Sequence, residues 1–153
     1  GKRDMVPVVL LDEPNGDYWR SLEQFIDRQL LGRGMISPED RSLFRITASV
    51  DEAVAEILAF FRVYHSMRYV HDRLVLRLSR PLSPEFVERI NVEYAGMLSE
   101  GRFALSGPLP EERDEPELAH LPRLVFAFNR SSFGVLRRLI DEVNRSQEVG
   151  ART

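Results

Sequence analysis

Hydrophobic residues in the first part of the chain alternate between short apolar runs and longer helical patterns. Residues 6–11 form a continuous apolar run rich in β-branched side chains, typical of a parallel strand buried on both faces. A helical pattern follows over 18–30, then strand-like residues at 43–47, then a helix that extends to Tyr64. The order strand, helix, strand, helix predicts a parallel sheet with right-handed crossovers.

The pattern changes near residue 68 to strands with one apolar and one wetter face. The predicted order is strand 73–78, helix 84–98, strand 102–106, strand 124–128 and helix 135–143. This β-α-β-β-α order is that of a ferredoxin-like unit without its final strand. The alternating apolar side chains that should face the two helices are Leu74, Leu76, Leu78, Leu124, Phe126 and Phe128.

The predicted fold class is therefore α/β followed by α+β. Residues 1–69 are expected to be the terminal β-α-β-α piece of a doubly wound parallel sheet, residues 70–146 a ferredoxin-like unit, and residues 147–153 a flexible tail. A strand as apolar as 6–11 needs a neighbour on each side and helices on both faces. Because the chain offers it one parallel partner, we expect the missing strands to lie upstream or on another chain.

Composition narrows the classes of function. The net charge is −3, which gives no overall attraction to nucleic acid or to an anionic membrane. The absence of cysteine excludes disulfides, thiolate nucleophiles and cysteine-based zinc sites. No apolar run approaches the ~20 residues of a membrane span, and no signal peptide is visible, so a cytoplasmic location is expected.

A set of motifs in residues 6–64 resembles the final third of the LOG (Lonely Guy, lysine decarboxylase-like) family. The motifs are PVVLLD at 7–12, GDYW at 16–19, FID at 25–27, GMIS at 34–37 and VDEAV at 50–54. The resemblance implies a Rossmann-type nucleotide-binding fold. It also implies, for a whole protein, hydrolysis of the N-glycosidic bond of nucleoside 5′-monophosphates.

The chain departs from that family in lacking its Pro-Gly-Gly-x-Gly-Thr loop, which holds the nucleotide phosphate through backbone N–H groups. The glycines Gly32 and Gly34 follow a helix and predict its end rather than a phosphate cradle. We therefore expect no catalytic residue and no cofactor in this chain, and no hydrolysis by it alone. A nucleoside monophosphate is the expected ligand only when the N-terminal half is present.

The loop after the first strand carries the candidate ligand-binding residues, because ligands of open α/β sheets bind beyond the carboxyl ends of the strands. Tyr18 and Trp19 could stack on a base, while Asp12 and Asn15, beside Gly16, could bind a sugar or base through hydrogen bonds. The alternative is a turn and a helix start, with Trp19 in the core or a dimer interface.

Other charged and histidine residues predict ordinary surface roles. His65 and His71 are six residues apart, whereas a metal pair on one helix face needs three or four, and His120 follows a polar loop. The acidic segment 111–117 is expected to be a solvated loop rather than a metal site. The arginines expected to form surface ion pairs are Arg20, Arg28, Arg33 and Arg41.

Three functional hypotheses remain from the sequence. The first is the C-terminal fragment of a LOG-like phosphoribohydrolase. The second is a non-catalytic regulatory or oligomerisation module that binds a small effector or its own copy. The third is a split protein whose other half is a separate chain. The expected protein partner is a second copy or the N-terminal half of the same protein.

Overall fold

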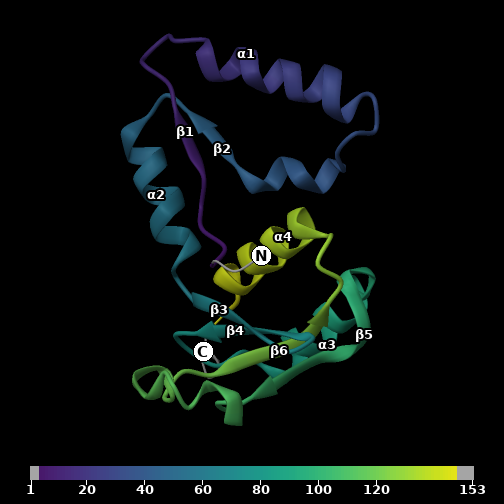
Figure 1. Ribbon diagram of the computed structural model, residues 1–153. Helices are drawn as coiled ribbons and strands as arrows, with labels where there is room; N and C mark the ends of the chain where they lie inside the picture. The colour runs from purple at the N-terminus through teal and green to yellow at the C-terminus, as the bar shows by residue number, and fades with distance from the viewer. Residues whose placement is uncertain (1–3, 148–153) are drawn as a thin grey trace.

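A computed structural model describes residues 4–147 of the protein and contains two sheets (Figure 1). Two parallel strands form the first sheet, and four antiparallel strands form the second. Helices accompany both sheets, so the fold is mixed α/β. Apart from Gln147, the expected tail at 147–153 lies outside the described residues.

The first part follows the predicted order of strand, helix, strand and helix. Its elements are β1 (Val9–Leu11), α1 (Tyr18–Phe25), the π-helix η1 (Ile26–Leu31), the 3₁₀ helix η2 (Pro38–Leu43), β2 (Arg45–Thr47) and α2 (Val50–Phe60). Strand β1 pairs in parallel with β2, with Val9 opposite Arg45 and Leu11 opposite Thr47. Both strands are shorter than the runs that predict them, and within residues 4–147 each has only the other as a hydrogen-bonded neighbour.

The prediction that the second helix reaches Tyr64 is wrong. Helix α2 ends at Phe60, and β3 (Tyr64–Val70) pairs antiparallel with β4 (Arg73–Leu78). The apolar pattern does not reveal β3, because it is an edge strand with a register shift between Tyr64 and Ser66. The boundary expected at residue 69 therefore falls within a strand of the antiparallel sheet.

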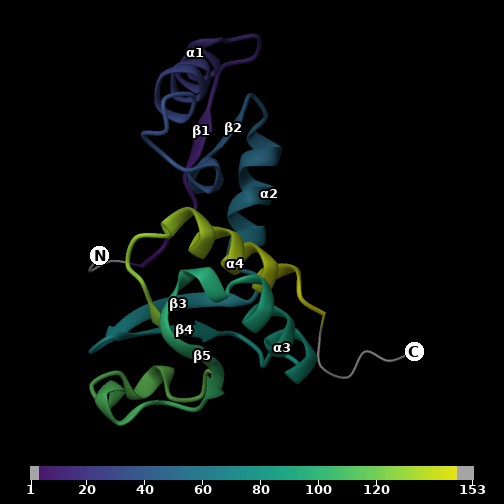
Figure 2. The same ribbon diagram turned by 90° about the vertical axis from the view of Figure 1, so that its right-hand side faces the viewer.

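The antiparallel sheet has the strand order β3-β4-β6-β5, and two helices cover one of its faces (Figure 2). The other elements of this part are α3 (Pro84–Glu93), η3 (Ala95–Met97), β5 (Leu98–Ser106), β6 (Arg123–Phe128) and α4 (Phe133–Arg145). The burial predicted for six alternating strand side chains is confirmed, since each is at most 2% exposed: Leu74, Leu76, Leu78, Leu124, Phe126 and Phe128. They pack against apolar residues of α3 and α4.

The connection between β5 and β6 covers the opposite face of this sheet (Figure 2). It contains the short helices η4 (Pro110–Glu112) and η5 (Pro116–Leu118). Val75 and Val125 form a small buried cluster on that face, and Leu109 of the connection packs against it. The sheet is therefore buried on both faces, by helices on one and by an irregular segment on the other.

Helix α4 joins the two parts of the protein (Figure 1). It approaches η2 so closely that a Cβ on Gly134 would lie 2.4 Å from the backbone carbonyl carbon of Glu39. The Ser42 hydroxyl donates a hydrogen bond to the Gly134 carbonyl (2.8 Å). At the other end of α4, the buried Asn144 amide oxygen accepts hydrogen bonds from the backbone N–H groups of Val63 and Tyr64, at 2.8 and 2.9 Å. These contacts fix the chain where β3 begins.

Exposed apolar side chains concentrate in the first part of the chain. Of the fourteen large hydrophobic residues exposed in the described chain, twelve lie between Val6 and Phe61. The remaining two are Val92 and Leu105, whereas the main apolar core is built almost wholly from residues after 59. The parallel sheet and its helices therefore present apolar surface that residues 4–147 leave exposed.

Candidate functional site

The loop at residues 12–17 lies at the carboxyl ends of both parallel strands. The backbone N–H of Asp12 donates to the Thr47 carbonyl (2.9 Å), which brings the ends of β1 and β2 together. Thr47 is buried, and Ser49 just beyond it caps α2 by accepting from the Glu52 N–H (3.3 Å). This is the edge at which open α/β sheets bind ligands.

The Asp12 carboxylate organises the loop. It accepts hydrogen bonds from the backbone N–H groups of Glu13 and Trp19, both at 3.2 Å. A Cβ on Gly16 would lie 2.4 Å from Asp12 Oδ1, so a larger residue would displace the Asp12 carboxylate from this turn. Asp12 and Gly16, both candidate ligand residues from the sequence, thus serve to shape the turn and to anchor the start of α1.

Two aromatic residues at the start of α1 have different environments. The half-buried Trp19 donates its indole N–H to the Leu11 carbonyl (3.1 Å), which fixes the ring against β1. Tyr18 is 71% exposed and meets the Trp19 ring edge-on, with 4.8 Å between ring centroids. Asn15 is exposed as well and has a positive φ of 67°. Of the candidate ligand residues, Tyr18 and Asn15 are therefore the two that remain exposed.

The three histidines do not form a common site. His65 on β3 is exposed and contacts Ser66 (3.0 Å), while His71, in the turn after β3, lies 3.5 Å from Glu111. His120 is exposed in the connection that follows η5. Within residues 4–147, no cluster of three or more histidine, aspartate or glutamate side chains is arranged to hold a metal ion.

Of the four arginines expected to form surface ion pairs, one does so within the described residues 4–147. Arg41 pairs with Glu23 (2.5 Å) and Asp27 (3.0 Å), as expected for surface ion pairs. Its guanidinium also lies over the Phe44 ring, 5.2 Å from the ring centroid. Arg20, like Arg28 and Arg33, forms no ion pair with any described residue.

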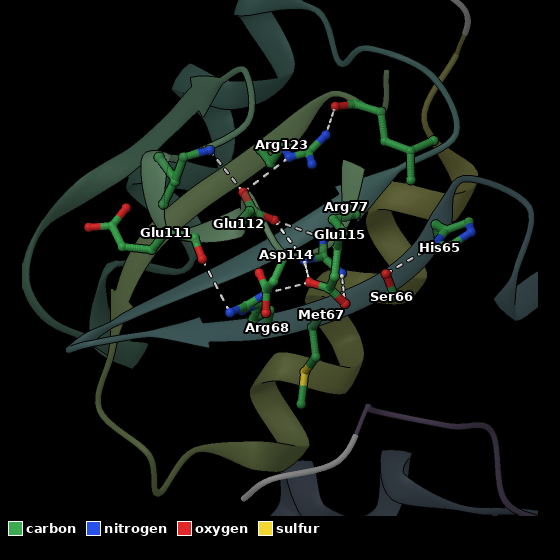
Figure 3. Close-up of polar contacts among 12 residues, drawn as sticks. His65, Ser66, Met67, Arg68, Arg77, Glu111, Glu112, Asp114, Glu115 and Arg123 are labelled. Atoms are coloured by element: carbon green, nitrogen blue, oxygen red, sulfur yellow. Dashed lines mark hydrogen bonds and ion pairs between the residues drawn. The ribbon is translucent and has the colours of Figure 1, made fainter. Parts of the chain in front are cut away.

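The prediction that the acidic segment 111–117 is a solvated loop is wrong for Glu112. Glu112 is 3% exposed and lies beneath the connection, between two buried arginines of the sheet (Figure 3). It contacts Arg77 at 2.8 Å and Arg123 at 3.3 Å, and accepts from the Leu109 backbone N–H at 2.9 Å. Charge pairing on the otherwise uncovered face of the sheet accounts for this burial.

The rest of the acidic segment extends this network toward solvent. Glu115 contacts both Arg77 and Arg68, and Asp114 lies 2.6 Å from Arg68 (Figure 3). Burial by itself would raise the pKa of Glu112, but the Leu109 N–H and the arginines lower it below its usual value. Hydrogen bonds from the arginines lower the pKa values of Glu115 and Asp114 in the same direction. All three carboxylates are therefore held in their charged form.

A sequence signal for this network existed. Arg77 and Arg123 occupy positions in β4 and β6 that alternate with buried leucines, so both must point to the face opposite α3 and α4. Arginines that are buried on one sheet face need acidic partners. The strongly acidic segment near them in sequence is residues 111–117 of the β5–β6 connection. An ion pair between this segment and the two arginines could therefore have been predicted, although not its exact partners.

Comparisons with protein families, with curated proteins and with solved structures find no match to this chain. No helix within residues 4–147 has the length and apolar character needed to cross a membrane. Functional conclusions therefore depend on the residues and geometry described above.

Proposed function

We propose that this chain is the C-terminal part of a LOG-like nucleotide-binding protein. In this proposal, residues 4–62 complete a larger Rossmann-type parallel sheet, and residues 63–147 form an added α+β unit. The observation that carries the proposal is the exposed apolar surface of the first part. The whole protein would be a cytoplasmic nucleoside 5′-monophosphate phosphoribohydrolase, whose phosphate-holding loop lies outside this chain.

The exposed surface has the distribution that a doubly wound sheet would cover. Leu22 and Phe25 of α1 and Val54 and Ile57 of α2 are all exposed, although each lies on the apolar stripe of its helix. In an extended parallel sheet these stripes would pack on neighbouring strands. A sheet of two three-residue strands offers no such cover, which supports completion by further protein.

The edge of β1 supports the same proposal. Hydrogen bonds in a parallel pair involve alternate residues, and the Arg45 N–H donates to the Val8 carbonyl (2.9 Å). Val9 therefore directs its N–H and C=O away from β2, toward the position of a further strand. Charged side chains that would protect an edge are missing from residues 6–11, so this edge is suited to pairing.

The loop at residues 12–17 would then lie beside the nucleotide. Tyr18 offers an exposed aromatic face on which a base can stack, and Asn15 offers an amide at the turn. The phosphate would bind elsewhere, since the glycines Gly32 and Gly34 form no cradle at a strand end. In this proposal the chain contributes to recognition of the base, and another segment supplies the chemistry.

For residues 63–147 we propose a ferredoxin-like unit with a rearranged chain connection. In a β-α-β-β-α-β unit the last strand pairs beside the first. Here β3 lies beside β4 and precedes it in sequence, so the strand missing from the predicted β-α-β-β-α order would enter from the N-terminal side. The role proposed for this unit is regulatory or structural.

The experiment is to isolate the native polypeptide with an antibody against this chain, measure its intact mass and assay it with AMP, GMP and CMP. We expect a mass above 17.7 kDa and release of free base with ribose 5-phosphate. Tyr18→Ala in that polypeptide should raise the KM several-fold, whereas the control Val92→Ala on α3 should not change it. A native mass of 17.7 kDa with no hydrolysis would contradict the proposal.

A further inference from the structure

A cleft of about 560 Å³ lies between the two parts of the protein. Residues of α4 line one side, and residues of α2, η2 and β2 line the other. This volume is in the range of small-molecule sites, about 300–1,000 Å³. The cleft is separate from the loop at residues 12–17, because none of that loop's residues lines it.

Arginines dominate the charge of this cleft. Six arginines and three acidic residues line it, although the whole chain has a net charge of −3. Some of these arginines are held by carboxylates: Arg137 contacts Glu56 at 2.6 Å and Asp141 at 3.0 Å, and Arg145 contacts Glu142 at 3.2 Å. These pairs build the wall on the α4 side.

Two of the lining arginines have no such partner. Arg45 at the start of β2 and Arg62 after α2 are exposed, and neither side chain forms an ion pair or hydrogen bond with any residue from 4 to 147. Both belong to the first part of the chain. They leave two guanidinium groups available to a ligand on one side of the cleft.

The other side offers a tyrosine hydroxyl on a largely buried ring. Tyr94, which follows α3, lines the cleft and is 7% exposed, yet its hydroxyl has no hydrogen-bond partner in the described part of the chain. Burial raises the pKa of Tyr94, so the hydroxyl keeps its proton and can donate it in a hydrogen bond. The buried Arg137 also lines the cleft, and its guanidinium lies 4.7 Å from the Phe60 ring centroid.

We propose that this cleft binds a phosphorylated small metabolite, with Arg45 and Arg62 pairing with its phosphate and the Tyr94 hydroxyl donating to the same ligand. Guanidinium groups bind phosphate through paired, charge-assisted hydrogen bonds. The volume exceeds that of a free phosphate ion, so an organic portion is part of the ligand. Because the contacts come from both parts of the chain, the ligand ties the parallel sheet to the α+β unit.

The test is isothermal titration calorimetry of the 153-residue chain at low salt with ribose 5-phosphate, AMP and inorganic phosphate. We expect ribose 5-phosphate or AMP to bind more tightly than inorganic phosphate, with affinity falling as salt increases. Arg45→Gln and Arg62→Gln should each weaken binding about tenfold or more. Tyr94→Phe, which keeps the ring, should weaken it several-fold and leave the thermal unfolding of the chain unchanged.

Arg20→Gln and Arg113→Gln are the matched controls, since both arginines are exposed, without ion pairs in the described chain, and outside the cleft. The proposal is overturned if none of the three probes binds or if inorganic phosphate binds as tightly as the esters. Equal weakening by the control variants would also overturn it. The residues that line the cleft are not those on which the proposed function depends, so either proposal can fail without the other. AMP binding that weakens with Tyr18→Ala, and not with Arg45→Gln, would place the ligand at the loop and refute the cleft alone.

Discussion

Replacing Glu112 by glutamine tests how the connection is held on the sheet. Glu112 is buried between Arg77 and Arg123, and Gln would keep its shape and its acceptor for the Leu109 N–H. Glu115 would still pair with Arg77, but Arg123 contacts no other carboxylate among the described residues. Removing one partner of a buried ion pair costs about 3–5 kcal/mol, because it leaves the other charge buried without compensation.

The assay is equilibrium unfolding in urea followed by circular dichroism. With a slope of about 2 kcal/mol per M, the unfolding midpoint of Glu112→Gln should fall by about 2 M. The control Glu117→Gln, at an exposed residue of the same connection, should change the free energy of unfolding by about 0.5 kcal/mol or less. Adding Arg123→Met to Glu112→Gln should recover part of the loss. A loss from Glu112→Gln no larger than that of the control would refute the reasoning.

Three further predictions concern the junction, the pH dependence and the exposed edge. Gly134→Ala should lower the free energy of unfolding by about 1–3 kcal/mol in a urea titration, because its Cβ would overlap the backbone of Glu39. Gly96→Ala, where nothing lies within 4 Å, should not. The carboxylates of the Glu112 network have folded pKa values below the unfolded 4.5 of Glu and 3.8 of Asp, so the unfolded chain binds more protons. Their contribution to the free energy of unfolding should thus be complete above about pH 5 and disappear as the pH falls through the lower pKa values of the folded chain. Urea titrations at a series of pH values would measure this decrease. The chain should associate at high concentration, and Val9→Lys should suppress this in light scattering while Val92→Lys should not; an unchanged monomer throughout would contradict the exposed-edge account.

Local patterns predicted much of the fold. The alternation of Leu74, Leu76 and Leu78 predicted β4 and its buried face. Ser83 before a proline predicted the start of α3, where the Ser83 hydroxyl accepts a hydrogen bond from the Phe86 N–H at 3.1 Å. Strand β3 was missed because its residues show no apolar alternation, and its pairing with β4 is interrupted by a register shift near Tyr64. The turn that joins the two strands, His71 and Asp72, is not one of the common hairpin sequences such as Asn-Gly or Asp-Gly.

The position of the candidate loop was predictable from the sequence. Its position at the end of the first strand followed from the chain order, and the loop lies there. The sequence could not separate Asp12 and Trp19, which hold the turn, from Asn15 and Tyr18, which remain exposed. Which of these residues are held and which are exposed depends on hydrogen bonds across the loop. The basic cleft was not predicted, because its residues come from segments that only the folded chain brings together.

The central claim is that further protein pairs with β1 and completes the parallel sheet. Amide hydrogen exchange at Val9 tests it most directly, because this N–H points away from β2. The measurement compares the 153-residue chain at low concentration with the native polypeptide isolated from its source. The account predicts rapid exchange in the chain alone and exchange slowed by about 100-fold or more in the native polypeptide. Equal and rapid exchange in both would contradict it.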